Sequence, residues 1–138
     1  MDNIPTDLQP AAVMRPPPPG KVQAIGVMHL ISGIFNLMGA MTWAVIGFTY
    51  GIASFGLLLP LCCPVFFLLP LGILEIISGA KHLGSKHTGL RPPKGLAIAE
   101  ICGILLCGTF SLIFGILTLV FLSDPEVTAW YEKNQLEG

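Results

Sequence analysis

Long apolar stretches alternate with short polar segments along this chain. No Asp, Glu, Lys or Arg occurs between Val22 and Leu74, and between Gly95 and Ser123 the only such residue is Glu100. A helix that crosses a bilayer needs roughly 20 apolar residues to cover about 30 Å of hydrocarbon. The pattern therefore predicts an all-α integral membrane protein with three transmembrane helices, at about 22–46, 56–80 and 95–122.

Glycine and proline set the predicted boundaries of the first two spans. A glycine-bounded segment from Gly47 to Gly51 is typical of a break between helices. Pro60 and Pro64 suit the opening turns of the second span, where a missing N–H costs little. Pro70 lies deeper, so a bend is expected there unless neighbouring helices satisfy the freed carbonyl.

Polar segments flank this predicted transmembrane bundle of residues 21–122. Residues 1–20 include four consecutive prolines, Pro16 to Pro19, and are predicted to form a disordered cytoplasmic tail. The loop 81–94 carries basic residues and no acid, so we expect it to meet anionic lipid headgroups. Its two histidines, His82 and His87, have no spacing that would fix a metal site.

The segment 123–138 is predicted to begin with a short amphipathic helix that lies in the membrane interface. Asp124 can cap this helix and Pro125 fits its first position. Val127, Trp130 and Tyr131 then share one face, as expected of an interfacial helix.

The basic residues predict which side of the membrane each end of the three-span arrangement faces. Six of them fall on the side of the N-terminus and one on the other: Arg15, Lys21, Lys81, Lys86, Arg91 and Lys94 against Lys133. The positive-inside rule therefore predicts a cytoplasmic N-terminus and an external C-terminus, in a plasma or bacterial inner membrane. Four spans would split the same charges four against three and give almost no orienting signal. With three spans, the aromatic residues expected as anchors at the outer interface are Trp43, Tyr50, Trp130 and Tyr131.

Composition and the lack of catalytic motifs argue against a soluble domain, a nucleic-acid binder and an enzyme. The chain is 53% hydrophobic and 11% charged, whereas a soluble domain carries about 25% charged residues. A net charge of −1 argues against nucleic acid as a partner. No nucleophile elbow, zinc-protease motif or nucleotide loop is present, and the four cysteines fall at two depths. We therefore expect no enzyme activity, no metal and no cofactor.

Small and polar residues recur at helical spacing on each predicted span. Such residues let helix backbones approach closely in lipid, and the polar ones link helices by hydrogen bonds. The residues expected to pack helices in this way are Ser32, Gly33, Asn36, Gly72, Gly79, Gly103, Ser111 and Gly115. They predict a structural or regulatory protein that associates with itself or with other membrane proteins.

Each predicted span contributes one ionisable side chain, and all three fall at a similar depth. His29, Glu75 and Glu100 lie about 7–11 Å from the cytoplasmic end of their spans at 1.5 Å per residue. Ionisable groups inside a membrane mark functional sites by default. Three interpretations stay open: a proton or cation relay, hydrogen-bonded structural contacts, or acids that snorkel toward Lys81 and Lys94.

Two short apolar motifs carry a family resemblance. Residues 22–33, VQAIGVMHLISG, and residues 72–80, GILEIISGA, are similar to parts of the first and second spans of the CD20-like (MS4A) tetraspan membrane protein family. The basic loop and the start of the third span at Lys94 also match its layout, so the resemblance covers about residues 22–122. It implies a non-enzymatic oligomeric membrane protein linked to signalling, trafficking or ion flux. The family's fourth span has no counterpart in the pattern here.

Overall fold

Helices are the regular elements of the computed structural model, which describes residues 17–58, 60, 63–84, 90–103 and 109–136. In chain order they are α1 (Gly20–Ala53), α2 (Cys63–Leu83), α3 (Lys94–Cys102), α4 (Thr109–Leu122) and α5 (Pro125–Leu136). The described part contains no strand, which agrees with the predicted all-α class. Most of the predicted tail lies outside the described residues, as do Lys86 and His87 in the basic loop.

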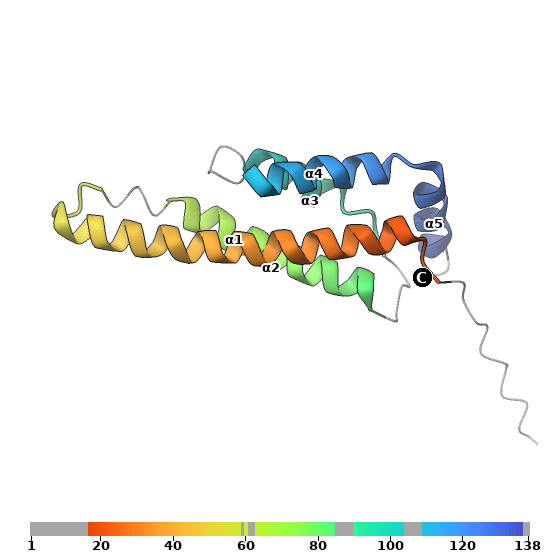
Figure 1. Ribbon diagram of the computed structural model, residues 1–138, viewed down its shortest axis with the longest axis horizontal. Helices are drawn as coiled ribbons and strands as arrows, with labels where there is room; N and C mark the ends of the chain where they lie inside the picture. Colours follow the sequence, from red (N-terminus) through yellow and green to blue (C-terminus); the bar gives the residue numbers. More distant parts are fainter. Residues whose placement is uncertain (1–16, 59, 61–62, 85–89, 104–108, 137–138) are drawn as a thin grey trace, which may run out of the picture.

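Two long apolar helices form one layer of the molecule. Among the described residues, α1 and α2 are the helices that by themselves are long and apolar enough to cross a membrane. They run side by side; α4 packs along part of α1, and α3 lies beside α4 and contacts α2 (Figure 1). Pro64 falls in the first turn of α2 and Pro70 in its interior.

The predicted helix break at 47–51 is wrong, because α1 continues to Ala53. Its end is made by Ser54, whose backbone N–H and hydroxyl both donate to the Tyr50 carbonyl, at 3.0 and 2.7 Å. Phe55 and Gly56 then adopt left-handed backbone angles, with φ of 52° and 92°. A glycine adopts this conformation at little cost, so the chain turns at Gly56 instead. Gly47 and Gly51 are accommodated within the helix.

The third predicted span, 95–122, is also wrong as a single helix. Its residues form two helices, α3 and α4, which lie against each other (Figure 1). A Cβ added at Gly115 on α4 would stand 2.7 Å from the Ala97 carbonyl oxygen on α3. Uninterrupted apolar sequence fits one long helix or two packed ones equally well, so only this close approach separates them. The end of α4, from Ser111, would form a third span only together with α5, and these two are bent by 78°.

α5 folds back onto the start of α1. Val127 and Tyr131 are buried in an apolar cluster with Val22 and Ile25, and Leu90 and Leu122 complete it. The C-terminal end of the chain therefore lies beside the beginning of α1 (Figure 1). As predicted, Pro125 starts this helix and the Asp124 carboxylate accepts the Glu126 backbone N–H at 3.0 Å.

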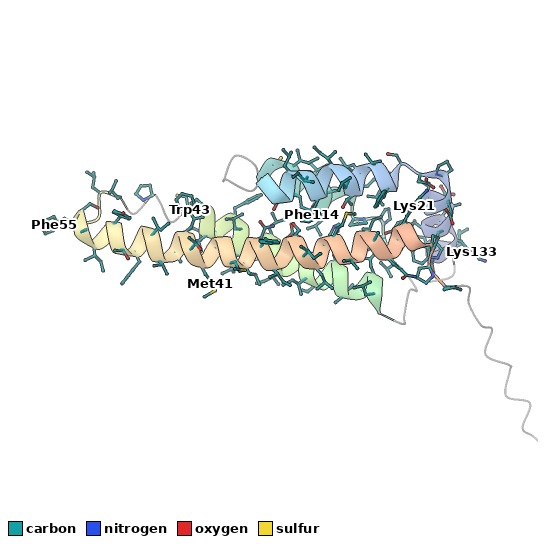
Figure 2. All side chains as sticks on the ribbon, viewed as in Figure 1. Lys21, Met41, Trp43, Phe55, Phe114 and Lys133 are labelled. Atoms are coloured by element: carbon teal, nitrogen blue, oxygen red, sulfur yellow. The ribbon has the colours of Figure 1, made fainter. Side chains whose placement is uncertain are left out.

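This docking overturns the predicted aromatic belt. Trp130 and Tyr131 are in α5 at the first turns of α1, whereas Tyr50 lies in the last turn of α1, so the four anchors do not share one interface. Trp43 and Lys133 stand far apart along the molecule (Figure 2). Tyr131 is only 3% exposed, because it packs into the apolar cluster rather than facing an interface.

An ion pair between exposed side chains joins α5 to α1. Lys21 donates to the Asp124 carboxylate. This contact lowers the pKa of Asp124, because the positive charge of Lys21 favours the charged carboxylate. Asp124 also accepts the helix N-terminal N–H group, so its charged form both caps α5 and holds it to α1.

Candidate functional site: a buried polar file

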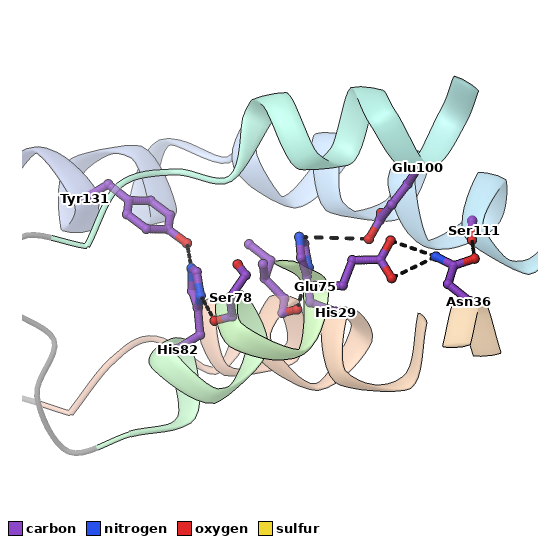
Figure 3. A network of polar contacts seen from close by, with 9 residues as sticks. His29, Asn36, Glu75, Ser78, His82, Glu100, Ser111 and Tyr131 are labelled. Atoms are coloured by element: carbon purple, nitrogen blue, oxygen red, sulfur yellow. Dashed lines mark hydrogen bonds and ion pairs between the residues drawn. The ribbon is translucent and has the colours of Figure 1, made fainter. Parts of the chain in front are cut away.

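Three helices bring their ionisable side chains together inside the bundle. His29 on α1, Glu75 on α2 and Glu100 on α3 are each 0% exposed. His29 Nε2 lies 3.9 Å from Glu100 Oε1, and Glu75 and Glu100 are close enough to interact electrostatically. The structure therefore groups the three residues that the depth argument placed in one layer, in the arrangement of Figure 3.

Local helix geometry sets the orientation of His29. Its Nδ1 lies 3.0 Å from the Ile25 carbonyl oxygen one turn earlier, so Nδ1–H donates to that oxygen. With the proton on Nδ1, the neutral ring presents Nε2 as an acceptor toward Glu100. A hydrogen bond between the two then requires one further proton, carried by either the imidazole or the carboxyl group.

Asn36 connects Glu75 to the fourth helix. Its Nδ2 donates to both oxygens of Glu75, at 2.9 and 2.8 Å, and its Oδ1 accepts the Ser111 hydroxyl at 2.9 Å. These bonds fix both ends of the Asn36 amide and tie α1, α2 and α4 together. The sequence placed Asn36 on the same helix face as His29 but offered no signal that it pairs with Glu75.

Several buried polar atoms in and around the site form no hydrogen bond. Within the described part of the chain, Glu100 Oε1 and Oε2, His29 Nε2, Ser32 Oγ and Thr118 Oγ1 are buried without a hydrogen-bond partner. Leaving a buried polar atom unpaired costs roughly 1–3 kcal/mol, more for a charge. A proton on Glu100 would add a donor beside His29 Nε2, which in the neutral ring can only accept.

A second pair extends the polar residues to the end of the bundle. His82 Nε2 lies 2.7 Å from the Tyr131 hydroxyl, and His82 Nδ1 lies 2.7 Å from the Ser78 carbonyl oxygen. If Nδ1–H donates to that carbonyl, Nε2 accepts the Tyr131 O–H, and burial raises the pKa of this hydroxyl. The rings of His82 and His29 are stacked with centroids 6.3 Å apart.

We call this row of side chains the polar file. It runs from α5 through the centre of the bundle to α4 (Figure 3), and its members are Tyr131, His82, His29, Glu100, Glu75, Asn36 and Ser111. The sequence placed His82 in the basic loop, but α2 extends to Leu83 and His82 is 2% exposed. One available signal was its spacing of seven residues from Glu75, which puts both on one face of a helix.

Glycines bring α1 and α2 into backbone contact at two levels. A Cβ at Gly33 would stand 2.7 Å from the Gly72 carbonyl oxygen, and one at Gly79 would stand 2.6 Å from the Gly26 carbonyl oxygen. The two pairs are seven residues apart on each antiparallel helix. All eight residues expected to pack helices are buried: Ser32, Gly33, Asn36, Gly72, Gly79, Gly103, Ser111 and Gly115. The contacts that Asn36, Gly72 and Gly115 make join helices within this one chain.

The described residues contain no group of three or more His, Cys, Asp or Glu side chains placed to hold a metal ion. Comparison with known proteins adds no further guide: no family model matches the chain, and no match was found among curated proteins or solved structures. The resemblance to the CD20-like family therefore stays a prediction.

Proposed function

We propose that this chain is a small integral membrane protein of structural or regulatory type, not an enzyme, that works through helix association in the bilayer. One observation carries the proposal: the molecule turns its large apolar side chains outward and its polar ones inward. On α1, Met41, Val45 and Phe48 are 71%, 65% and 66% exposed, while His29 and Asn36 are buried. Such a surface is an aggregation hazard in water but matches a hydrocarbon solvent.

The proposed topology has two spans, α1 and α2, with both chain ends on the cytoplasmic side. Nine residues in α3 extend only about 14 Å, too short for about 30 Å of hydrocarbon, so α3 and α4 would enter and return on one side. Lys21 and Lys133 both lie at the end of the molecule where α1 begins (Figure 2). No Lys or Arg occurs from Val22 to Ala80, which includes the turn between α1 and α2. The positive-inside rule then favours cytoplasmic termini.

Accessibility of tags tests this topology. We expect N-terminal and C-terminal epitope tags on the full chain to be reached by a protease from the same, cytoplasmic face of sealed vesicles. The physical reason is that α5 packs on the start of α1, so the two ends cannot be separated by a bilayer. A C-terminal tag that is reached only from the opposite face would contradict two spans and restore the three-span arrangement.

Self-association is tested by counting molecules. Full-length protein that carries one fluorophore, reconstituted at high lipid excess, should show two or more photobleaching steps per particle. A dilution series with added lipid controls for chance co-localisation, since crowding falls with dilution and specific association persists. Single bleaching steps at every dilution would contradict self-association.

A second candidate function is proton or cation handling by the polar file. It is favoured by the unpaired oxygens of Glu100, which face His29 and Glu75 in the interior. Proton transfer between His29 and Glu100 needs only a small side-chain shift, because Nε2 and Oε1 lie 3.9 Å apart, just beyond hydrogen-bond distance. Conduction of a hydrated cation would require several copies of the chain, since so few helices do not enclose a water-filled pore.

Proton flux into proteoliposomes distinguishes this candidate. If the polar file carries protons, Glu100→Gln and Glu75→Gln should each lower pH-driven flux by about a hundredfold, the lower part of the range for a positioned proton-transfer group. Glu132→Gln, an exposed change on α5, is the matched control and should leave flux unchanged. Wild-type flux equal to that of empty vesicles would overturn this function. Loss of thermal stability without any flux would assign the acids a structural role.

A further inference from the structure

A cavity of about 560 Å³ opens between the end of α2 and the start of α3. Its walls are amphiphilic. Leu74, Ile77 and Leu96 form apolar walls, and Lys81 and Arg91 add two positive charges. We propose that this cavity binds one anionic phospholipid, with its phosphate between Lys81 and Arg91 and an acyl chain along the apolar wall.

The two basic side chains are available for an anion. Lys81 and Arg91 are both exposed, and neither forms an ion pair with a carboxylate in the described part of the chain. None of the described residues that line the cavity is acidic. Their charges are therefore uncompensated within this site, whereas the exposed Lys21 is paired with Asp124.

The start of α3 adds to the positive potential. Its first turn contains no acidic residue, and no side chain caps its N-terminal N–H groups. The cavity is lined by Pro92 and Pro93 just before this helix and by Leu96 in its first turn. Unsatisfied N–H groups and the helix dipole favour negative charge at such an end.

The position along α2 specifies a lipid rather than a soluble anion. Lys81 is the first basic residue after the apolar stretch of α2, so it marks the boundary between hydrocarbon and headgroups. Leu74 and Ile77, two turns and one turn earlier, are 55% and 46% exposed at hydrocarbon depth. A free phosphate would use only the cationic rim, whereas a phospholipid uses both parts of the cavity. This inference rests on the proposed membrane insertion of α1 and α2.

Lipid retention tests the site. Full-length protein purified from vesicles of equal phosphatidylglycerol and phosphatidylcholine should retain phosphatidylglycerol preferentially. Lys81→Gln with Arg91→Gln should lower this preference about thirtyfold, because each basic residue near the surface contributes about fivefold. Lys133→Gln, an exposed basic residue on α5 outside the cavity, should leave the preference unchanged.

A second variant probes the apolar part of the cavity. Leu96→Trp places a larger side chain in the acyl-chain path and keeps both charges, so it should lower retained phosphatidylglycerol severalfold. Unchanged retention in this variant would overturn placement of the acyl chain in the cavity. Displacement of the lipid by millimolar glycerol phosphate would instead identify a site for soluble anions and overturn the lipid assignment.

Three further outcomes distinguish diffuse attraction to lipid, loss of the lipid site alone and failure of membrane insertion. If Lys133→Gln lowers the preference as much as the double variant, the attraction is diffuse and the cavity is not the site. If the wild-type protein floats with the vesicles but shows no preference, the lipid site alone is overturned. If the wild-type protein does not float with them, membrane insertion is overturned and the lipid site with it.

Discussion

Replacing Gly79 with alanine is expected to lower the free energy of unfolding by about 3 kcal/mol, the upper part of the range for overpacking a tight interior. The new Cβ would stand 2.6 Å from the Gly26 carbonyl oxygen and 2.9 Å from the Leu30 backbone nitrogen. Both contacts are with backbone, so no side-chain rotation relieves them and the two helices must separate. The measurement is the unfolding midpoint of the purified full chain in detergent, followed by far-ultraviolet circular dichroism.

Gly95→Ala is the matched control for this change. A Cβ at Gly95 meets nothing within 4 Å, so only the intrinsic helix preference for alanine acts there. That preference stabilises by up to about 1 kcal/mol, opposite in sign to the effect expected at Gly79. Equal effects of the two changes would show that α1 and α2 do not touch at this level.

Replacing Asn36 with leucine is expected to destabilise the protein by about 3 kcal/mol, because it leaves a buried acid and a buried hydroxyl without this partner. Asn36 gives two hydrogen bonds to Glu75 and accepts one from Ser111, and all three residues are nearly inaccessible. Without the amide, both the carboxyl group and the hydroxyl lose the partner shown here. Thermal unfolding of the purified variant measures this effect.

A double-mutant cycle measures the interaction energy between Asn36 and Glu75. Asn36→Leu combined with Glu75→Leu replaces both partners with apolar groups of similar size, so it should recover most of the stability lost by Asn36→Leu alone. Ser111→Ala removes one neutral hydrogen bond and should cost only about 1 kcal/mol. Additive losses in the double variant would contradict direct coupling between Asn36 and Glu75.

The apolar pattern located the helical segments, but it did not predict where the chain turns between them. Uncharged runs located α1, α2 and the residues of α3 and α4, because burial in lipid or between helices requires apolar side chains. The boundaries failed where glycine was interpreted as a break. Gly47 and Gly51 stay inside α1, whereas the chain turns after Ser54, where the hydroxyl and the backbone N–H both bond the Tyr50 carbonyl.

The candidate site was partly visible in the sequence. Helical periodicity put His29, Glu75 and Glu100 at one depth because the rise per residue is constant. Periodicity could not identify Asn36 as the partner of Glu75, since that contact joins residues 39 positions apart on different helices. His82 was not predicted as part of the site, because the second span was predicted to end before it and this side chain was assigned to a loop.

The sequence by itself determined the helical class, the apolar character of the long helices and the scarcity of charge along them. These follow from local composition and spacing, which each segment carries independently of the others. Only the tertiary structure decided that α3 and α4 lie against each other, that α5 returns to the start of α1, and that the polar side chains join into one file. Such features depend on contacts between segments far apart in the chain. Gly115 lets α4 approach Ala97 on α3, whereas an apolar cluster that includes Val127 and Val22 holds α5 to α1.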